Sequence, residues 1–523
     1  MAGVSSLKTW LESHPRVRSF ILTAFIAAGI FLPRLWQLDS FFIQDEHLWI
    51  NRAQLYSTAM QRNDLVGASA FELQNHPAIT LLSTVGPTMQ IYGWQHDLPG
   101  TYESWPLNNR REAAAWARLV LGFVASSALF ALYRLLGKLK FFAGMPWAAG
   151  GIAILLGLEP WIWGITRTVI VDTLMAIFLV LSLVTGVLAR ERRDMRFVAL
   201  AGAWWALAFL SKSPSLIILP IALLVPTLLH PREWKQVLQR LLVWVGGAYL
   251  TLITVWPPFL LHPVTRFRGV FARVEYHTAL KETYLWPGWH VPFFMYILSG
   301  FAVIGCVLYV WQRWLTRRSD RSQLLAFDII LASGVWFGAV LLYLHGDHAR
   351  KNVPVLALLA TAGAAGWILL LRRYHCLRPW GVLGLVVLQF ALVYPWFPHL
   401  PSYHNALFPS REGKRLLVDV GNGSRLIANY VSWHPEPIVA ATNLPGLAAF
   451  YVREDRRGNL RRLPARLDDL SPEVTHIIVP ESYPARINFD PAAVSLLHDL
   501  EGKQPETILS IRDVPLFKVY RVK

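Results

Sequence analysis

The sequence predicts an α-helical, polytopic membrane protein of about eleven transmembrane helices, followed by a small extracytoplasmic α/β domain. The chain of 523 residues is 54% hydrophobic and only 16% charged, with a mean hydropathy of +0.37. A soluble chain carries about 25% charged residues. The apolar residues stand in blocks such as "FILTAFIAAGIFLPRLW", and about 20 of them span a hydrocarbon core of ~30 Å as a helix.

Eleven blocks are long enough to be spans. They cover 17–38, 111–136, 142–158, 162–190, 195–211, 213–230, 238–260, 290–312, 324–344, 351–372 and 379–396. The first is not expected to be a cleaved signal peptide, because "PRLWQLDSFF" follows it without a small-residue cleavage site. Cys306 and Cys376 fall in or beside spans, so no disulfide framework is expected.

Basic residues alternate along the chain as the positive-inside rule requires. With a cytoplasmic N-terminus, six inner segments carry three or four Lys or Arg each, and the short outer turns carry one or two. The net charge of +17 therefore reflects topology, and no nucleic-acid binding is expected. An odd number of spans leaves residues 397–523 outside, after a membrane domain at 1–396. There, "EGKRLLVDVGNGSRLIANYVSW" predicts a helix, and "EPIVAAT", "VTHIIVP" and "PLFKVYRV" predict strands.

Two outer loops are long, at 39–110 and 261–290. Each contains a segment with apolar residues at helical spacing, which is typical of helices that lie in the membrane interface. In the first loop the stripe is Trp49, Ala53, Tyr56 and Met60; in the second it is Phe267, Val270, Phe271 and Val274.

Charged residues on the outer side are the candidates for chemistry. Asp45 and Glu46 open the first interfacial helix, where acids can also simply cap the helix. Neighbouring residues on a helix diverge by about 100°, so both cannot reach one atom. We expect one general base and one orienting or capping residue. His76 and His277 are lone candidates with a structural or anion-binding alternative.

Asp172 and Lys212 lie at the outer ends of spans. An acid at that depth costs a few kcal/mol unless it faces a wet cavity or a cation. The alternative to a functional role for Asp172 is a structural ion pair with Arg167. The alternative for Lys212 is an ammonium that reaches the interface by snorkelling. Arg350 and Lys351 start the tenth span. Nearby His345, Asp347 and His348 suit a metal only weakly, against the alternative of a solvated polar turn.

Carboxylates and cations at a membrane surface suit one reaction in particular. A hydroxyl or amine acceptor needs a carboxylate base, and a lipid-linked sugar phosphate needs cations where negative charge develops on the departing phosphate. Two alternatives stay open from the residues: a transporter or flippase of lipid-linked sugars, and a non-catalytic membrane scaffold.

Several motifs, in order along the chain, resemble the GT-C glycosyltransferases that use polyprenyl-phosphate sugars. In particular, they resemble the protein mannosyltransferases and the aminoarabinose transferases of lipid A, in their bacterial branch. The motifs are the Asp45–Glu46 pair, "NHPAITLL", the Arg167–Asp172 segment, "LAFLSKSPSLI", "ARKNVPVLALLATAGAAG" and "LPSYHNALFPSREGKRLLVDVGNGSRLIANYV".

The resemblance implies a GT-C fold and a set of site residues. Asp45 is expected as the base, with Glu46 in support and Asp172 in the same site. The donor phosphate is expected to bind Lys212, Arg350, Lys351, Arg266, Arg268 and His76. His76 stands where some relatives have another residue before the proline, and "PSYHNALFPS" is a reduced form of the family pattern, so the tail assigns no acceptor.

The expected activity is transfer of a hexosyl or pentosyl group, with inversion, from a polyprenyl-phosphate sugar to an acceptor protein, lipid or cell-wall glycan. It would take place on the outer face of a bacterial plasma membrane, among membrane lipids. No cofactor is required on this expectation, and a divalent metal is compatible with it.

Overall fold

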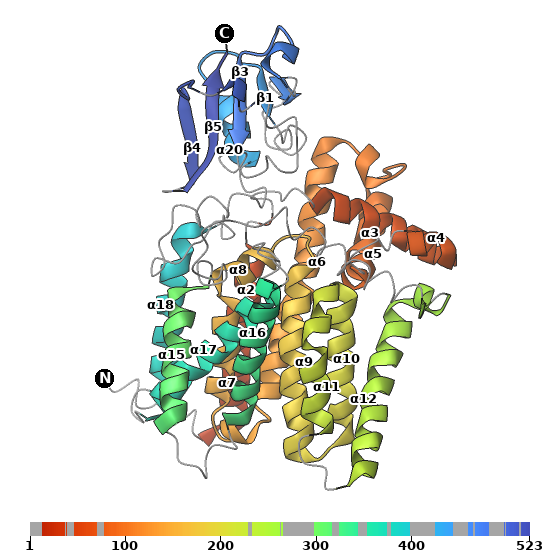
Figure 1. The fold of residues 1–523 in the computed structure, drawn as a ribbon, viewed down its shortest axis with the longest axis vertical. Helices are drawn as coiled ribbons and strands as arrows, with labels where there is room; N and C mark the ends of the chain where they lie inside the picture. Colours follow the sequence, from red (N-terminus) through yellow and green to blue (C-terminus); the bar gives the residue numbers. More distant parts are fainter. Residues whose placement is uncertain are drawn as a thin grey trace.

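A helical bundle with a small sheet domain stacked on one end makes up the molecule (Figure 1). The computed structural model describes residues 13–36, 38, 46–70, 78–228, 233–261, 263–264, 298–315, 324–343, 353–373, 378–397, 424–442, 459–463, 466–480, 496, 498–500, 502–511 and 514–522. We call the end of the bundle that carries the sheet domain the outer end, and the opposite end the inner end.

The helices of the first half are α2 (Pro15–Leu35), α3 (Glu46–Gln61), α4 (Leu65–Ala70), α5 (Ile79–Gln95), α6 (Leu107–Leu136), α7 (Pro146–Gly157), α8 (Pro160–Ile165), α9 (Asp172–Arg192), α10 (Met195–Ser211), α11 (Leu219–Thr227) and α12 (Trp234–Val255). The second half adds α15 (Gly300–Leu315), α16 (Leu325–Tyr343), α17 (Val353–Arg373), α18 (Arg378–Val393) and α20 (Ser424–Trp433). A 3-10 helix, Ser213–Ile218, leads from α10 into α11.

Each predicted span contains an apolar helix among the described residues. Four are long and apolar enough to cross a membrane by length and composition: Leu107–Leu136, Leu174–Arg192, Trp234–Val255 and Val353–Arg373. Seven further apolar helices have 10–17 residues. The helical character is confirmed, and the number of spans stays a prediction.

One predicted span is interrupted. Residues 162–190 were expected to form one helix, but α8 ends at Ile165 and α9 begins only at Asp172. The turn between them leaves the backbone N–H of Val169 without a helical partner, and this N–H donates to the carboxylate of Glu46. Apolar periodicity could not reveal the break, because the group that satisfies the freed backbone lies 123 residues away in the chain.

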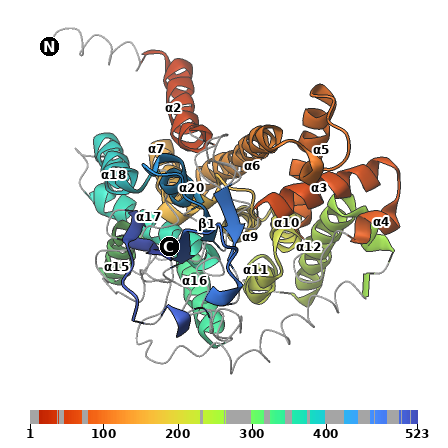
Figure 2. The same cartoon turned by 90° about the horizontal axis from the view of Figure 1, so that it is seen from above.

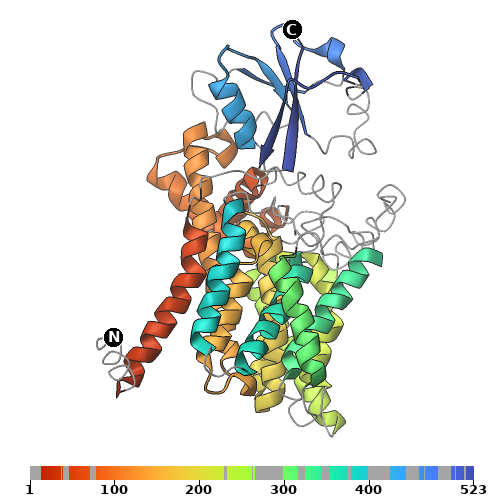
Figure 3. The same cartoon turned by 90° about the vertical axis from the view of Figure 1, so that its left-hand side faces the viewer.

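Basic residues from distant parts of the chain meet at the inner end. The backbone N–H of Lys140 donates to Glu191, and Arg192 donates to the carbonyl of Lys138. The guanidinium of Arg372 lies 5.0 Å from the ring centroid of Phe141. Three of the basic segments predicted to be cytoplasmic therefore share one end, while α2 runs from this end towards the outer one (Figure 3).

Helices α3, α4 and α5 lie at the outer end, beside the sheet domain and on the side of α10 and α12 (Figure 2). The predicted helix with its apolar stripe is present as α3. Trp49, Ala53 and Tyr56 are buried, however, because α5 packs closely against this helix: a Cβ added at Gly86 would overlap the carbonyl oxygen of Ala53. Protein therefore covers much of the stripe. The second predicted interfacial segment, with Phe267 to Val274, lies outside the described residues.

The C-terminal domain contains a mixed five-stranded sheet in the order β2-β1-β3-β5-β4. The strands are β1 (Ala440–Thr442), β2 (Leu460–Arg462), β3 (His476–Pro480), β4 (Thr507–Ile511) and β5 (Val514–Arg521). β1 is parallel to β2 and β3, and β5 is antiparallel to β3 and β4. The predicted helix is present from Ser424, and β1, β3 and β5 are the predicted strands; β2 and β4 were not expected.

Side chains alternate across this sheet with the period of two that strands impose. Ile477 and Val479 of β3 face a small cluster with Leu496 and Leu500. Ile478 faces the other way, into the cluster that contains Ile427, Ala428 and Val431 of α20. The sheet therefore has one face covered by α20, and His476 belongs to that face by register.

Two adjacent glycines of α12, Gly246 and Gly247, differ in how closely the neighbouring helix α10 packs against them. A Cβ at Gly247 would overlap the backbone of Ala199 on α10, whereas a Cβ at Gly246 would meet nothing within 4 Å. We expect Gly247→Ala to separate the two helices and to destabilise the protein by about 1–3 kcal/mol. Gly246→Ala should be neutral or slightly stabilising, because alanine favours a helix by up to ~1 kcal/mol. Thermal unfolding of the two purified variants in detergent checks this; equal melting temperatures would contradict it.

Candidate functional site

A buried ion pair fixes the start of α3 to the bundle. Both oxygens of Glu46 accept from Arg118 of α6: Nε donates to Oε1 and Nη2 to Oε2, each at 2.6 Å. Oε1 also accepts the N–H of Val169 at 2.7 Å, and Arg118 donates to the carbonyl of Leu38. Glu46 is 0% and Arg118 2% exposed. Two-pronged Arg–carboxylate pairs are among the strongest polar contacts in proteins, and their burial makes each partner dependent on the other.

A second buried pair lies at the outer ends of α9 and α10. Nζ of Lys212 is 2.5 Å from Oδ1 of Asp172, and the two side chains are 9% and 3% exposed. The structural alternative, in which Asp172 pairs with Arg167, is wrong, because Asp172 pairs with Lys212. Arg167 donates to the carbonyl of Trp36, and its guanidinium lies 4.3 Å from the ring centroid of Phe397. Burial of the Lys212 side chain also argues against a simple snorkelling role.

The two pairs share one turn of the chain. Val169, which donates to Glu46, is three residues before Asp172. A further buried contact anchors α5 to the neighbourhood of Lys212, since the hydroxyls of Thr80 and Ser211 are 2.6 Å apart. We call Glu46, Arg118, Asp172 and Lys212 the outer ion-pair site. It holds two negative and two positive groups, none of them on the surface.

The other predicted site residues lie outside the described part of the chain. These are Asp45, His76, Arg266, Arg268, Arg350 and Lys351, together with His277 and the His345, Asp347 and His348 group. The structure therefore brings Asp172 and Lys212 together and gives Glu46 a partner. The roles of the other residues stay predictions.

Arg118 is the residue that sequence reasoning missed. It was counted inside the second span, within "EAAAWARLVLGF". A lone arginine in an apolar block is costly unless it has a buried partner. That cost was the available indication, but the sequence could not say which of the outer acids would meet it.

The C-terminal domain contains a second group of titratable residues. His434, His476 and Glu506 have ligand atoms that all lie within 4.8 Å of one another. This group was not predicted, because its members are far apart in the sequence and follow no spacing typical of a metal motif.

Residues 107–261 match the family described as "Dolichyl-phosphate-mannose-protein mannosyltransferase". This segment contains Arg118, Asp172 and Lys212, and it confirms the predicted resemblance to the GT-C mannosyltransferases over its length. No curated protein sequence matched the chain.

Solved structures of an oligosaccharyltransferase from Archaeoglobus fulgidus are similar to this chain in outline. The complex with zinc and sulfate is 14% identical, with a TM-score of 0.43, and the match covers 92% of this chain and 70% of that one. The complex of this enzyme, AglB, with an inhibitory peptide and a dolichol-phosphate is 13% identical, with a TM-score of 0.45 and coverages of 94% and 72%.

The site gives a prediction about stability. Removing one partner of a buried ion pair costs ~3–5 kcal/mol, because the other charge stays buried without compensation. We expect Glu46→Gln and Arg118→Gln each to lower the melting temperature strongly, and the double variant to lose less than the sum of the two. Thermal unfolding of all three in detergent measures the coupling.

The control for this cycle is the exposed pair Arg461–Glu473 in the C-terminal domain, whose side chains are 39% and 48% exposed. Arg461→Gln should leave the melting temperature unchanged, because exposed pairs are screened by water. If the decreases in melting temperature of Glu46→Gln and Arg118→Gln simply add in the double variant, the buried pair does not couple α3 to α6.

Proposed function

We propose that this protein is a membrane glycosyltransferase. In this proposal a sugar moves from a polyprenyl phosphate to an acceptor on the extracytoplasmic face, and Asp45 is the general base. The observation that supports it most is the ion pair of Glu46 with Arg118, because Glu46 directly follows Asp45 and is tied to the outer end of the bundle. The family match over residues 107–261 supports glycosyl transfer as the reaction class.

The two neighbouring acids have different roles in this proposal. Both oxygens of Glu46 already accept hydrogen bonds, and the side chain is fully buried. A general base must be within hydrogen-bond reach of the proton that it takes, so Glu46 is a positioning residue. Its bond to Arg118 fixes the start of α3, and Asp45 is the residue directly before it in the sequence.

The donor phosphate is bound by cations at the same end, with Lys212 as the described member. A polyprenyl-phosphate sugar is a phosphodiester with one negative charge, and the phosphate that leaves it carries up to two. An ammonium has three donors, and Asp172 accepts from one of them, so the others can bind phosphate oxygens. Arg266, Arg268, Arg350, Lys351 and His76 complete the set as it was predicted.

The chemical step is a single displacement at the anomeric carbon. Asp45 takes the proton of the acceptor hydroxyl or amine, the acceptor atom forms the new bond to the anomeric carbon, and the bond from that carbon to the phosphate oxygen breaks. The electron pair stays on the departing phosphate, next to the cations. Attack opposite the leaving group inverts the configuration. Asp172 holds the Lys212 ammonium in place at modest cost, because the pair is neutral before the donor binds.

Neutralising the proposed base gives the first test of the mechanism. Asp45→Asn should reduce transfer by about 10²–10⁴-fold, since it removes general-base catalysis, while melting temperature and donor binding stay close to those of the wild type. The assay is release of polyprenyl phosphate from labelled polyprenyl-phosphate sugars by the purified protein in liposomes. Full activity of this variant would remove Asp45 from the mechanism, and a wild type that moves donor across the bilayer without consuming it would support the transporter alternative.

Changing the charge at Lys212 tests the proposed phosphate site. Lys212→Arg keeps a cation opposite Asp172 and should retain part of the activity, whereas Lys212→Met should raise KM for the donor and lower kcat as well. Lys212→Met leaves Asp172 buried without a cation, so its stability must be followed in parallel. In the double variant Asp172→Asn with Lys212→Met the uncompensated charge is gone, and recovery of stability without activity is the expected result. Transfer activity of that double variant would contradict the proposed roles of Lys212 and Asp172.

A further inference from the structure

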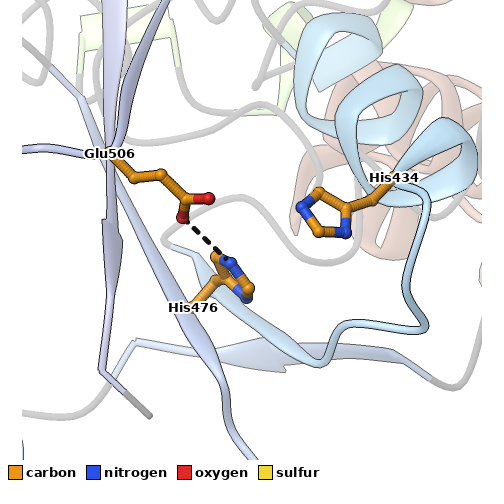
Figure 4. Close-up of side chains that lie close together, drawn as sticks. All are labelled: His434, His476 and Glu506. Atoms are coloured by element: carbon orange, nitrogen blue, oxygen red, sulfur yellow. Dashed lines mark ion pairs between the residues drawn. The ribbon is translucent and has the colours of Figure 1, made fainter.

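Two histidines and a glutamate from three separate elements meet in the C-terminal domain. His434 follows α20, His476 is the first residue of β3, and Glu506 directly precedes β4 (Figure 4). Nε2 of His476 lies 3.1 Å from Oε2 of Glu506, and the ligand atoms of all three residues lie within 4.8 Å of one another. No residue of the outer ion-pair site belongs to this group.

Hydrogen bonds at the far side of each ring indicate which nitrogen carries the proton. Nδ1 of His434 lies 3.0 Å from the carbonyl oxygen of Glu436, which can only accept. Nδ1 of His476 lies 2.8 Å from the hydroxyl of Thr475, and that hydroxyl donates its single proton to the carbonyl of Val439. With the Thr475 hydroxyl donating to Val439, Nδ1 is the donor in both rings and Nε2 carries a lone pair, an arrangement typical of metal-ligating histidines.

Nε2 of His476 lies beside the carboxylate of Glu506. His476 is 3% exposed, and its Nε2 has no hydrogen-bond donor among the described residues. Two acceptors at 3.1 Å repel each other unless a cation lies between them.

We propose that His434, His476 and Glu506 bind a divalent transition-metal ion, with Zn²⁺ as the best fit and water as the fourth ligand. Two imidazole nitrogens and one carboxylate suit zinc, whereas Ca²⁺ and Mg²⁺ prefer oxygen ligands alone. Ligands of a tetrahedral zinc site stand about 3.4 Å apart. The His476–Glu506 distance is already close to this value. The Glu506 side chain is 35% exposed, so it can move to close a wider gap.

The consequence of binding is a clamp between α20 and the sheet. His434 lies just beyond the end of α20, and the ion would tie it to β3 and to the residue before β4. Because such a site forms only in the folded domain, its binding free energy adds to the stability of the fold. The role is structural and independent of glycosyl transfer.

The experiment uses the full-length protein in detergent, stripped of metal by a chelator and then titrated with ZnCl₂. Bound zinc is counted by mass spectrometry of the metal, and the melting temperature is followed in parallel. We expect about one zinc per chain with micromolar or tighter affinity, a higher melting temperature, and no shift with MgCl₂ or CaCl₂. Failure of the wild type to retain zinc under these conditions would overturn the proposal.

Variants locate the ion. Glu506→Gln is a nearly isosteric change of an exposed side chain, so the metal-free protein should keep its melting temperature. Its zinc affinity should fall at least tenfold. His434→Asn should behave in the same way. His498→Ala is the matched control, because His498 is an exposed histidine of the same domain outside the group. Unchanged zinc binding in Glu506→Gln and His434→Asn, or equal loss in His498→Ala, would place the ion elsewhere and refute the site.

Discussion

The outer end of this molecule depends on the buried contact between Glu46 and Arg118. Neither charge could remain at its position alone, because the desolvation of a single buried ion costs several kcal/mol. Their mutual satisfaction requires four parts of the chain to meet: the residue at 38, the start of α3, the middle of α6 and the turn before α9. The position of α3 follows from that requirement, and α5 follows from α3 through the close approach at Gly86.

The same carboxylate allows the chain to leave the helical conformation between α8 and α9. An interrupted helix in an apolar bundle exposes N–H groups that lipid cannot satisfy, and Glu46 accepts one of them at Val169. This interruption places Asp172 at the first position of α9, opposite Lys212. The two ion pairs are therefore linked: Glu46 of the first pair stabilises the turn before α9, and this turn positions Asp172 of the second pair. The proposed glycosyl transfer would use a site that is neutral and organised before substrate arrives, as electrostatic catalysis requires.

Composition and apolar blocks were enough to predict the helices, because a helix that faces lipid and a helix in a protein core both consist largely of apolar residues. The stripe at Trp49, Ala53 and Tyr56 predicted α3 for the same reason, but it could not distinguish a membrane interface from the surface of α5. The buried partners of Arg118 and Lys212 could not be predicted for another reason. Each pairs across the fold, over 72 and 40 residues respectively, and the partner of a charge at such a distance is set by packing. In the C-terminal domain, β2 reads Leu-Arg-Arg, and β4 lies at an edge with Ile508 and Ser510 exposed, so neither shows the short apolar run that predicted β1, β3 and β5.

The position of His476 in the sheet is the step that connects the packing of this domain to its chemistry. Ile478, two residues further along β3, occupies the apolar face beneath α20, and register assigns His476 to that same face. An imidazole in such a row has to direct Nδ1 and Nε2 to partners, because an unsatisfied buried nitrogen costs ~1–3 kcal/mol. Thr475 accounts for Nδ1, whereas Nε2 meets a carboxylate with the same need for a cation. A domain with so small a core has little stability to lose at that position. In our proposal, one ion binds His476 and Glu506 together and so removes the cost of burying the unsatisfied Nε2. The same ion also binds His434 at the end of α20 and thereby links the helix to the sheet.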